Sequence, residues 1–331
     1  MRSAECGVRK AVSRITHYAS RARHPLRRRD SAVSQAFTLV EILVTVALLS
    51  VITLGLFAVF NQVQRAFRSS MNQVDQLEAG RAVTEMLPRE LEQTIPSGSP
   101  FPDGVNFYAL IPFSTPLTQS LPGTALLRTN LLEDCFMLVR SNRTWIGIGY
   151  CVRTADAAGR LSLPECRPGQ MGVGTLYRYY ATTNVLRTDD LNKGLPSDPG
   201  QLFRDFALAA QPGSAANLSR ICDGVIHFRF RAFDANGVLI TPLAANTNNM
   251  DIRFSTVAPG EIGLYKFWNN AVPASVEMEL GILEQRVWDR YSSIGDPNAR
   301  LAYLQRAESA SRVHLFRQRI PIRNFDPLAY Q

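Results

Sequence analysis

The sequence predicts an α+β protein in which one long N-terminal helix packs on an antiparallel sheet with extra loops and short helices. Three observations lead to this prediction. An apolar segment of bilayer length follows a basic leader, and an amphipathic helical pattern follows that segment. Alternating apolar residues and turn signals then recur through the rest of the chain.

The apolar segment runs from Phe37 to Phe60 and contains 24 residues. A helix of this length spans about 36 Å at about 1.5 Å per residue, and a bilayer core is about 30 Å thick. We therefore expect a transmembrane helix over 37–60. Residues 1–36 carry nine Lys and Arg against Glu5 and Asp30, a net charge of +7. This bias predicts a cytoplasmic leader and an exported C-terminal part.

One acid, Glu41, lies near the start of the apolar segment. A carboxylate inside a bilayer costs about 2.5–3.5 kcal/mol on insertion scales, so we expect the membrane or an assembly to neutralise it. A secretory signal has its small-residue cleavage site after the apolar core, whereas Ala36 precedes it. Cleavage after Ala36 would leave the helix on the mature protein, with a new amine at Phe37.

The segment Phe37-Thr38-Leu39-Val40-Glu41 closely resembles the signal of type IV prepilins and pseudopilins. The resemblance implies that a prepilin peptidase cuts between Ala36 and Phe37 and that Phe37 becomes methylated. It also implies that Glu41 pairs with the N-terminal amine of a neighbouring subunit. Ala36 stands where the family usually has Gly, and the leader is long for the family.

The same resemblance implies a location and a set of partners. The protein would cross the bacterial inner membrane once, with the leader cytoplasmic and the C-terminal domain periplasmic. Its partners would be the prepilin peptidase and other minor and major pseudopilins or pilins, and it would be assembled in a periplasmic pseudopilus.

Residues 61–93 predict an amphipathic extension of the same helix. Their apolar residues recur near helical spacing among Gln, Arg and Glu. They are Val63, Phe67, Val74, Leu77, Met86, Leu87 and Leu91. We expect this stripe to lie on the globular domain, and Pro88, which lacks a backbone donor, to kink or restart the helix.

Residues 94–331 predict an exported antiparallel-sheet domain. Residues 94–131 are rich in Pro, Ser, Thr and Gly and favour an irregular connection, and 183–220 are also loop-like. The expected strands are 135–140 and 144–153, which form a hairpin, then 175–182, 226–233, 238–240, 275–283 and 313–322. Asp234 to Gly237 predicts a hairpin turn. Short helices are expected near 202–210, 284–291 and 298–308.

The second half resembles a narrower group, the J-type minor pseudopilins of type II secretion. The matching segments are Asp223-Gly224-Val225 continuing to Phe230, and the strand from Pro273 to Leu280. Residues 183–220 and 241–270 look like insertions relative to that group. The resemblance covers about a third of the globular part.

Four cysteines fall in the exported part: Cys135, Cys151, Cys166 and Cys222. An even number outside the cytoplasm permits disulfides. Cys135 and Cys151 lie symmetrically about the turn at 141–144, so a cross-strand bridge could form. Cys151 with Cys166 is the competing pair.

Charge and motifs favour neither nucleic-acid binding nor catalysis. The formal charge of +8 falls to +1 for residues 37–331, and Arg312 to Arg323 fits a solvated strand face. His227 and His314 are the two histidines after the leader, and no spacing suggests a metal or a cofactor. Gly147 and Gly149 lack the setting of a dinucleotide site and fit a strand.

The resemblance makes a non-enzymatic minor pseudopilin the leading functional hypothesis. It would join the tip or initiation complex of a type II secretion pseudopilus through its N-terminal helix. The alternative is a minor type IV pilin that acts as a surface- or DNA-binding module at a pilus tip. An exported enzyme on a signal anchor is a third hypothesis, which the missing catalytic motifs disfavour.

Overall fold

A computed structural model describes residues 38–99, 104–112, 115–142, 144–184, 199–214, 218–242 and 249–330. The chain divides after Asn61 into two units, which are described separately. The expected cleavage site between Ala36 and Phe37 lies outside the described residues.

The first element is a single helix, α1 (Leu39–Leu91). Its first part, Leu39–Arg68, is long and apolar enough to cross a membrane, which is consistent with a single-pass anchor. The expected continuation into the amphipathic segment is confirmed. Pro88 does not restart the helix, which continues through it to Leu91. The chain turns away just after Leu91, where Glu92 N still donates to Pro88 O at 2.9 Å.

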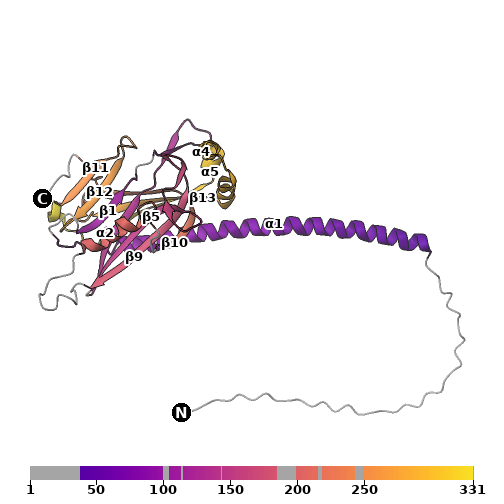
Figure 1. Ribbon diagram of the computed structural model, residues 1–331, viewed down its shortest axis with the longest axis horizontal. Coiled ribbons are helices and arrows are strands. Elements are labelled where there is room, and N and C mark those ends of the chain that lie inside the picture. The colour runs from indigo at the N-terminus through magenta and orange to yellow at the C-terminus, as the bar shows by residue number, and fades with distance from the viewer. Residues whose placement is uncertain are drawn as a thin grey trace, which may run out of the picture. The chain divides into compact units, whose positions relative to one another are not determined.

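The second unit is built on a curled antiparallel sheet (Figure 1). Its strands follow the order β11-β12-β1-β4-β5-β9-β10-β13-β14. Their bounds are β1 (Val105–Leu110), β4 (Asp134–Ser141), β5 (Thr144–Ala155), β9 (Gly174–Asn184), β10 (Ser219–Phe233), β11 (Met250–Phe254), β12 (Ile262–Trp268), β13 (Ser275–Leu283) and β14 (Val313–Pro321). A short strand, β6 (Leu161–Ser162), adds to β5. Two small hairpins pair β2 (Leu117–Ser120) with β3 (Leu127–Asn130), and β7 (Glu165–Arg167) with β8 (Gln170–Met171).

The strands expected after residue 134 are confirmed, except for 238–240, and so is the hairpin of β4 and β5. The turn expected at Asp234 to Gly237 is also confirmed, because Gly237 N donates to Asp234 O at 3.1 Å and Gly237 has a φ of 78°. The segment after this turn forms only an isolated bridge, from Leu239 to Phe233, and not a full strand.

One further expectation was wrong: residues 94–131 are not an irregular connection, since they contain β1, β2 and β3. The segment 241–270, which the sequence suggests as an insertion, contains β11 and β12. β1 lies inside the sheet between β12 and β4, where its residues Val105 and Phe107 are fully buried. The Pro- and Ser-rich residues around β1 predict no strand, because β1 is stabilised by pairing with β12 and β4, which are distant in sequence.

The C-terminal part of α1 packs on one face of the sheet. Leu87 and Leu91, which belong to the predicted apolar stripe, are fully buried in the main core, and so is Val83. Gly80 allows a close approach, because a Cβ at this position would lie 2.9 Å from both Ile282 Cδ1 of β13 and Phe316 Cε2 of β14. Nearer the start of the helix, Val63 and Phe67 are exposed, so these two members of the stripe do not lie on the globular domain as expected.

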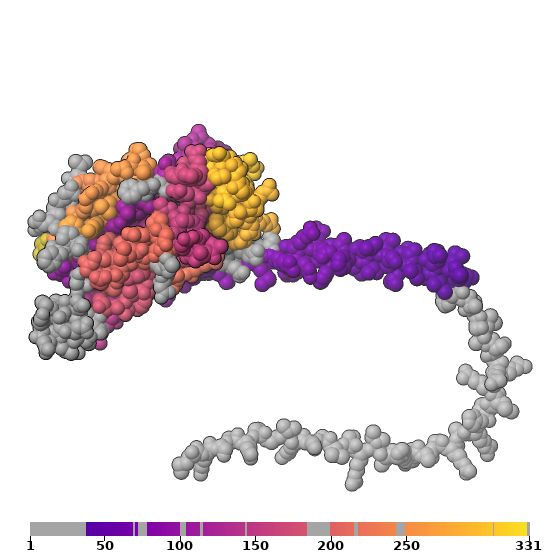
Figure 2. Space-filling view, in the orientation of Figure 1, coloured from indigo at the N-terminus to yellow at the C-terminus, as the bar shows by residue number. Residues whose placement is uncertain are grey.

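Short helices cover other parts of the sheet. α2 (Gly200–Ala209) packs on β5 and β9 through Leu202 and Phe206. Its salmon-coloured surface lies on the outside of this unit (Figure 2). α3 (Gln285–Ser293) and α4 (Pro297–Gln305) share a separate apolar cluster that includes Tyr291 and Leu304, and α5 (Ala307–Ser311) follows. A 3-10 helix, Pro327–Tyr330, ends the described chain. All three expected short helices are thus present.

Candidate functional site

The start of α1 carries the residues of the sequence motif that the structure describes. Thr38 caps the helix, since Glu41 N donates to Thr38 Oγ1 at 3.3 Å and Ile42 N donates to Thr38 O at 3.2 Å. Thr38 and Glu41 therefore have the spacing of a capping box, in which the acid also suits the positive end of the helix dipole. Glu41 is exposed, so its carboxylate is open to a partner.

The hydroxyl groups of the other polar side chains in the apolar segment donate hydrogen bonds to carbonyl groups of their own helix. Thr45 Oγ1 donates to Ile42 O, Ser50 Oγ to Val46 O and Thr53 Oγ1 to Leu49 O, at 2.7–2.9 Å. Such bonds remove most of the cost of a hydroxyl in hydrocarbon. Between Leu39 and Phe60, Glu41 is the one ionisable residue. The carboxylate of Glu41 is therefore the one charged group of this segment, and it is the group that needs a partner in a membrane.

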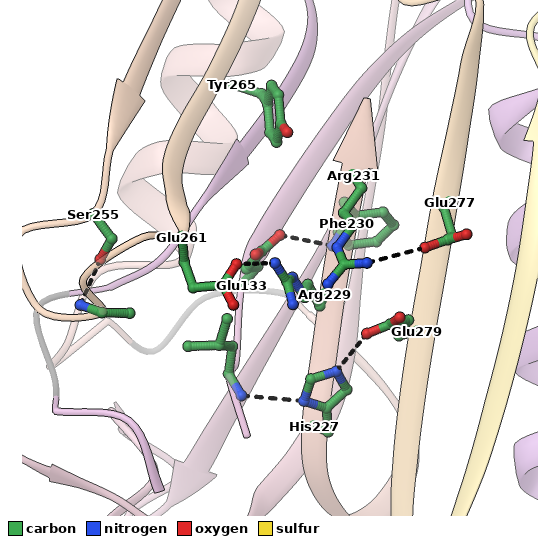
Figure 3. Close-up of polar contacts among 12 residues, drawn as sticks. Glu133, His227, Arg229, Phe230, Arg231, Ser255, Glu261, Tyr265, Glu277 and Glu279 are labelled. Carbon is green, nitrogen blue, oxygen red and sulfur yellow. Dashed lines mark hydrogen bonds and ion pairs between the residues drawn. The ribbon is translucent and has the colours of Figure 1, made fainter. Parts of the chain in front are cut away.

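A second polar region lies on one face of β10, β13 and β14 and was not predicted (Figure 3). Arg231 of β10 lies opposite Glu277 of β13, and Glu277 lies opposite Arg319 of β14. The arrangement is repeated two residues further along each strand, by Arg229, Glu279 and Arg317. We call these six residues the charge ladder.

Ion pairs link the strands of the charge ladder. Arg317 Nη2 lies 2.8 Å from Glu277 Oε1, and Arg317 Nε lies 3.4 Å from Glu279 Oε1. Arg231 Nη1 is 3.6 Å from Glu277, while Arg229 pairs with Glu261. Opposite charges at directly facing positions stabilise a strand pair by roughly 0.2–1 kcal/mol. The ladder therefore favours the observed register of the three strands.

His227, at the end of the charge ladder, uses both ring nitrogens within the fold. Leu131 N donates to Nδ1 at 3.2 Å, so that nitrogen is unprotonated and Nε2 donates to Glu279 Oε2 at 3.1 Å. Burial lowers the pKa of His227, and the bond from His227 lowers the pKa of Glu279 to about 2. His227 is therefore a packed strand residue whose ring serves the fold.

Glu133 is a buried acid next to this region that the sequence did not single out. Phe230 N donates to its Oε2 at 2.8 Å, and its own backbone N donates to Phe228 O at 2.8 Å. Burial raises the pKa of Glu133 to about 8, although the Phe230 bond and Arg229 act in the opposite direction. The side chain therefore joins β10 to the start of β4.

The four cysteines are free and buried, and neither pairing considered from the sequence is formed. In the β4–β5 register Cys135 faces Tyr150, so Cys151 is one position out and points to the opposite face. Cys135 lies in the main core, Cys151 beneath α2, and Cys166 in the cluster of α3 and α4. Burial raises the pKa of Cys151 and of Cys222 to about 12, which makes both thiols unreactive.

Within the described ranges, no group of three or more His, Cys, Asp or Glu side chains could hold a metal ion. The expected strand position of Gly147 and Gly149 is confirmed in β5. The chemistry that these residues offer is ion pairing and hydrogen bonding, in the sheet and at the start of α1. No sequence signal distinguished the charge ladder from solvated strand faces.

The fold and this arrangement define an α+β protein with one long apolar N-terminal helix and a curled antiparallel sheet. No known protein family, curated protein or solved structure matches the chain.

Proposed function

We propose that the chain is a non-enzymatic subunit of the pilin and pseudopilin type, most like a minor pseudopilin of type II secretion. It would be anchored in the inner membrane by α1 and would join a tip or initiation complex through that helix. The observation that carries the proposal is the single exposed carboxylate, Glu41, at the start of an otherwise un-ionised apolar segment. A carboxylate there favours a cationic partner inside the membrane or the assembly.

Cleavage by the peptidase would supply that partner, because it creates an N-terminal amine on every processed subunit. In this chain the amine would be at Phe37. In a low-dielectric assembly the attraction between this amine and Glu41 of a neighbour would offset much of the desolvation of both groups. The prepilin peptidase and sister minor subunits are the partners that this proposal requires.

Two variants of Glu41 test the proposal against the local role of this residue in the helix cap. Glu41→Gln keeps a capping-box residue but removes the charge, whereas Glu41→Val removes both. Both variants should be cut before Phe37 and remain in the membrane fraction. Both should fail to co-purify with the sister minor subunits encoded in the same genome, when the membranes are solubilised in mild detergent.

The comparison between the two variants decides the outcome. If Glu41→Gln assembles as well as the unaltered chain, Glu41 serves only the helix cap and the proposal fails. N-terminal sequencing provides the second criterion, because a mature protein that begins after the apolar segment, near Asn61, would lack the helix altogether.

A further inference from the structure

The strand β14 forms one edge of the sheet, with β13 as its single neighbour. Its register with β13 is continuous from Val313, opposite Leu283, to Pro321, opposite Ser275, and contains no bulge. The other edge strand, β11, is shorter and has a register shift between Arg253 and Phe254. Short or bulged edges resist pairing with further chains, whereas long regular edges invite it.

The hydrogen bonds that flank β14 show which of its backbone groups face outward. Glu284 N donates to Arg312 O at 2.8 Å, and Ile322 N donates to Ala274 O at 3.0 Å. Because bonded positions alternate along an antiparallel pair, the even-numbered residues of β14 bond to β13. The outward positions are Val313, Leu315, Arg317, Arg319 and Pro321. Among the described residues, none forms a hydrogen bond with the backbone groups of these five outside the β13–β14 pair.

The long side chains of β14 do not shield this edge. Ion pairs with Glu277 and Glu279 hold the side chain of Arg317 over β13. Arg319 Nε donates to Ser275 Oγ at 3.0 Å, and its guanidinium lies 3.9 Å from the centre of the Phe233 ring. Leu315 is 49% exposed and offers an apolar contact beside the open backbone.

Charge identifies the kind of strand that would fit here. From Val313 to Asn324 the chain contains Arg317, Arg319, Arg323 and His314, and no acid. Arg317 is paired with Glu277 and Glu279, and Arg323 with Glu92, whereas Arg319 has no acidic partner among the described residues. Two copies paired through β14 would bring like charges face to face, which is destabilising, whereas acids on an added strand would be attracted. We propose that β14 binds an extended acidic segment of another protein, which adds to the sheet as a further strand. This inference is independent of the assembly role of Glu41.

The test uses the full chain in detergent micelles and two synthetic peptides of the length of β14. One peptide alternates Glu with Val, and the control alternates Lys with Val. Fluorescence anisotropy should show binding of the Glu peptide and at least tenfold weaker binding of the Lys peptide. Leu315→Pro removes one outward N–H without removing a bond to β13, so it should weaken binding of the Glu peptide at least tenfold. Leu315→Thr keeps the N–H and should bind nearly normally.

Amide hydrogen exchange provides a readout that does not depend on a variant. On binding the Glu peptide, the amides of Leu315, Arg317 and Arg319 should become protected. Those of Phe316 and Gln318 should change little, because they already bond to β13. Equal binding of both peptides, no binding, or protection without this alternation would overturn the proposal. Protection of the same amides on raising the protein concentration alone would assign the edge to a second copy and would also overturn it.

Discussion

Glu90 of α1 accepts a hydrogen bond from Arg178 Nη2 of β9 at 2.6 Å, although the two residues are 88 positions apart in sequence. The second carboxylate oxygen of Glu90 accepts from Tyr150 Oη of β5. Both charged side chains are largely buried, at 15% and 20% exposure. Burial, and then the neighbouring Glu90, raises the pKa of Tyr150, so the phenol stays protonated and donates. The contact joins the helix to the middle of the sheet.

Glu90→Gln should therefore destabilise the protein. The variant removes the charge that compensates Arg178 and leaves the guanidinium poorly paired in a mostly buried position. We expect the free energy of unfolding to fall by about 1–3 kcal/mol. Urea unfolding followed by near-ultraviolet circular dichroism measures this change.

The matched control is Glu85→Gln on the same helix. Glu85 pairs with Arg81 at 3.5 Å, but the two side chains are 60% and 80% exposed. Water screens such a pair, so the loss should stay below about 0.5 kcal/mol. Equal effects of the two variants would show that the contact of Glu90 with the sheet adds no stability.

Gly149 of β5 should not tolerate a side chain, because α2 packs directly on it. A Cβ at this position would overlap the ring of Phe206, which is itself almost fully buried and stacked on Phe136. Gly149→Ala should lower the free energy of unfolding by about 1–3 kcal/mol, the usual cost of overpacking a core. In contrast, Gly295→Ala meets nothing within 4 Å and should be neutral, or stabilising by up to about 1 kcal/mol. Thermal melting of both variants checks the difference, and an unchanged melting temperature in Gly149→Ala would contradict it.

The sequence predicted the elements whose signal is local. The apolar run of α1, the hairpin of β4 and β5 and the alternation in β13 each follow from residue spacing over a few turns or a single strand. The Asp234 to Gly237 turn was also predictable, since Gly accepts the positive φ that the turn requires.

Elements stabilised by distant partners could not be predicted in this way. β1 is a strand because β12 and β4 pair with its two edges, and both lie outside its local sequence. In the charge ladder, Arg231 and Glu277 could be assigned to each other only once the β10–β13 register was known. Glu133 follows the same rule, since its burial depends on Phe228 and Phe230, almost a hundred residues later.

Glu133 should make the free energy of unfolding fall as the pH rises towards 8. Its pKa is about 8 in the folded protein and about 4.3 in an unfolded chain. Between these values the folded state holds a proton that the unfolded state has lost, so raising the pH favours unfolding. The nearby His227 acts in the opposite direction, because its folded pKa is lowered from 6.5 and its stability contribution is gained as the pH rises towards that value. The effect of Glu133 is therefore best separated between pH 7 and pH 8.

Glu133→Gln isolates this effect, because glutamine keeps an oxygen that can accept from Phe230 N but does not titrate. From pH 7 to pH 8 the unaltered chain should lose about 1 kcal/mol more of its free energy of unfolding than the variant does. The buried thiols of Cys151 and Cys222, whose pKa values are also raised, contribute equally to both proteins and cancel in the difference. Urea titrations at the two pH values measure this difference. Parallel pH dependence of the two proteins would show that Glu133 is ionised in the fold and held by the nearby Arg229.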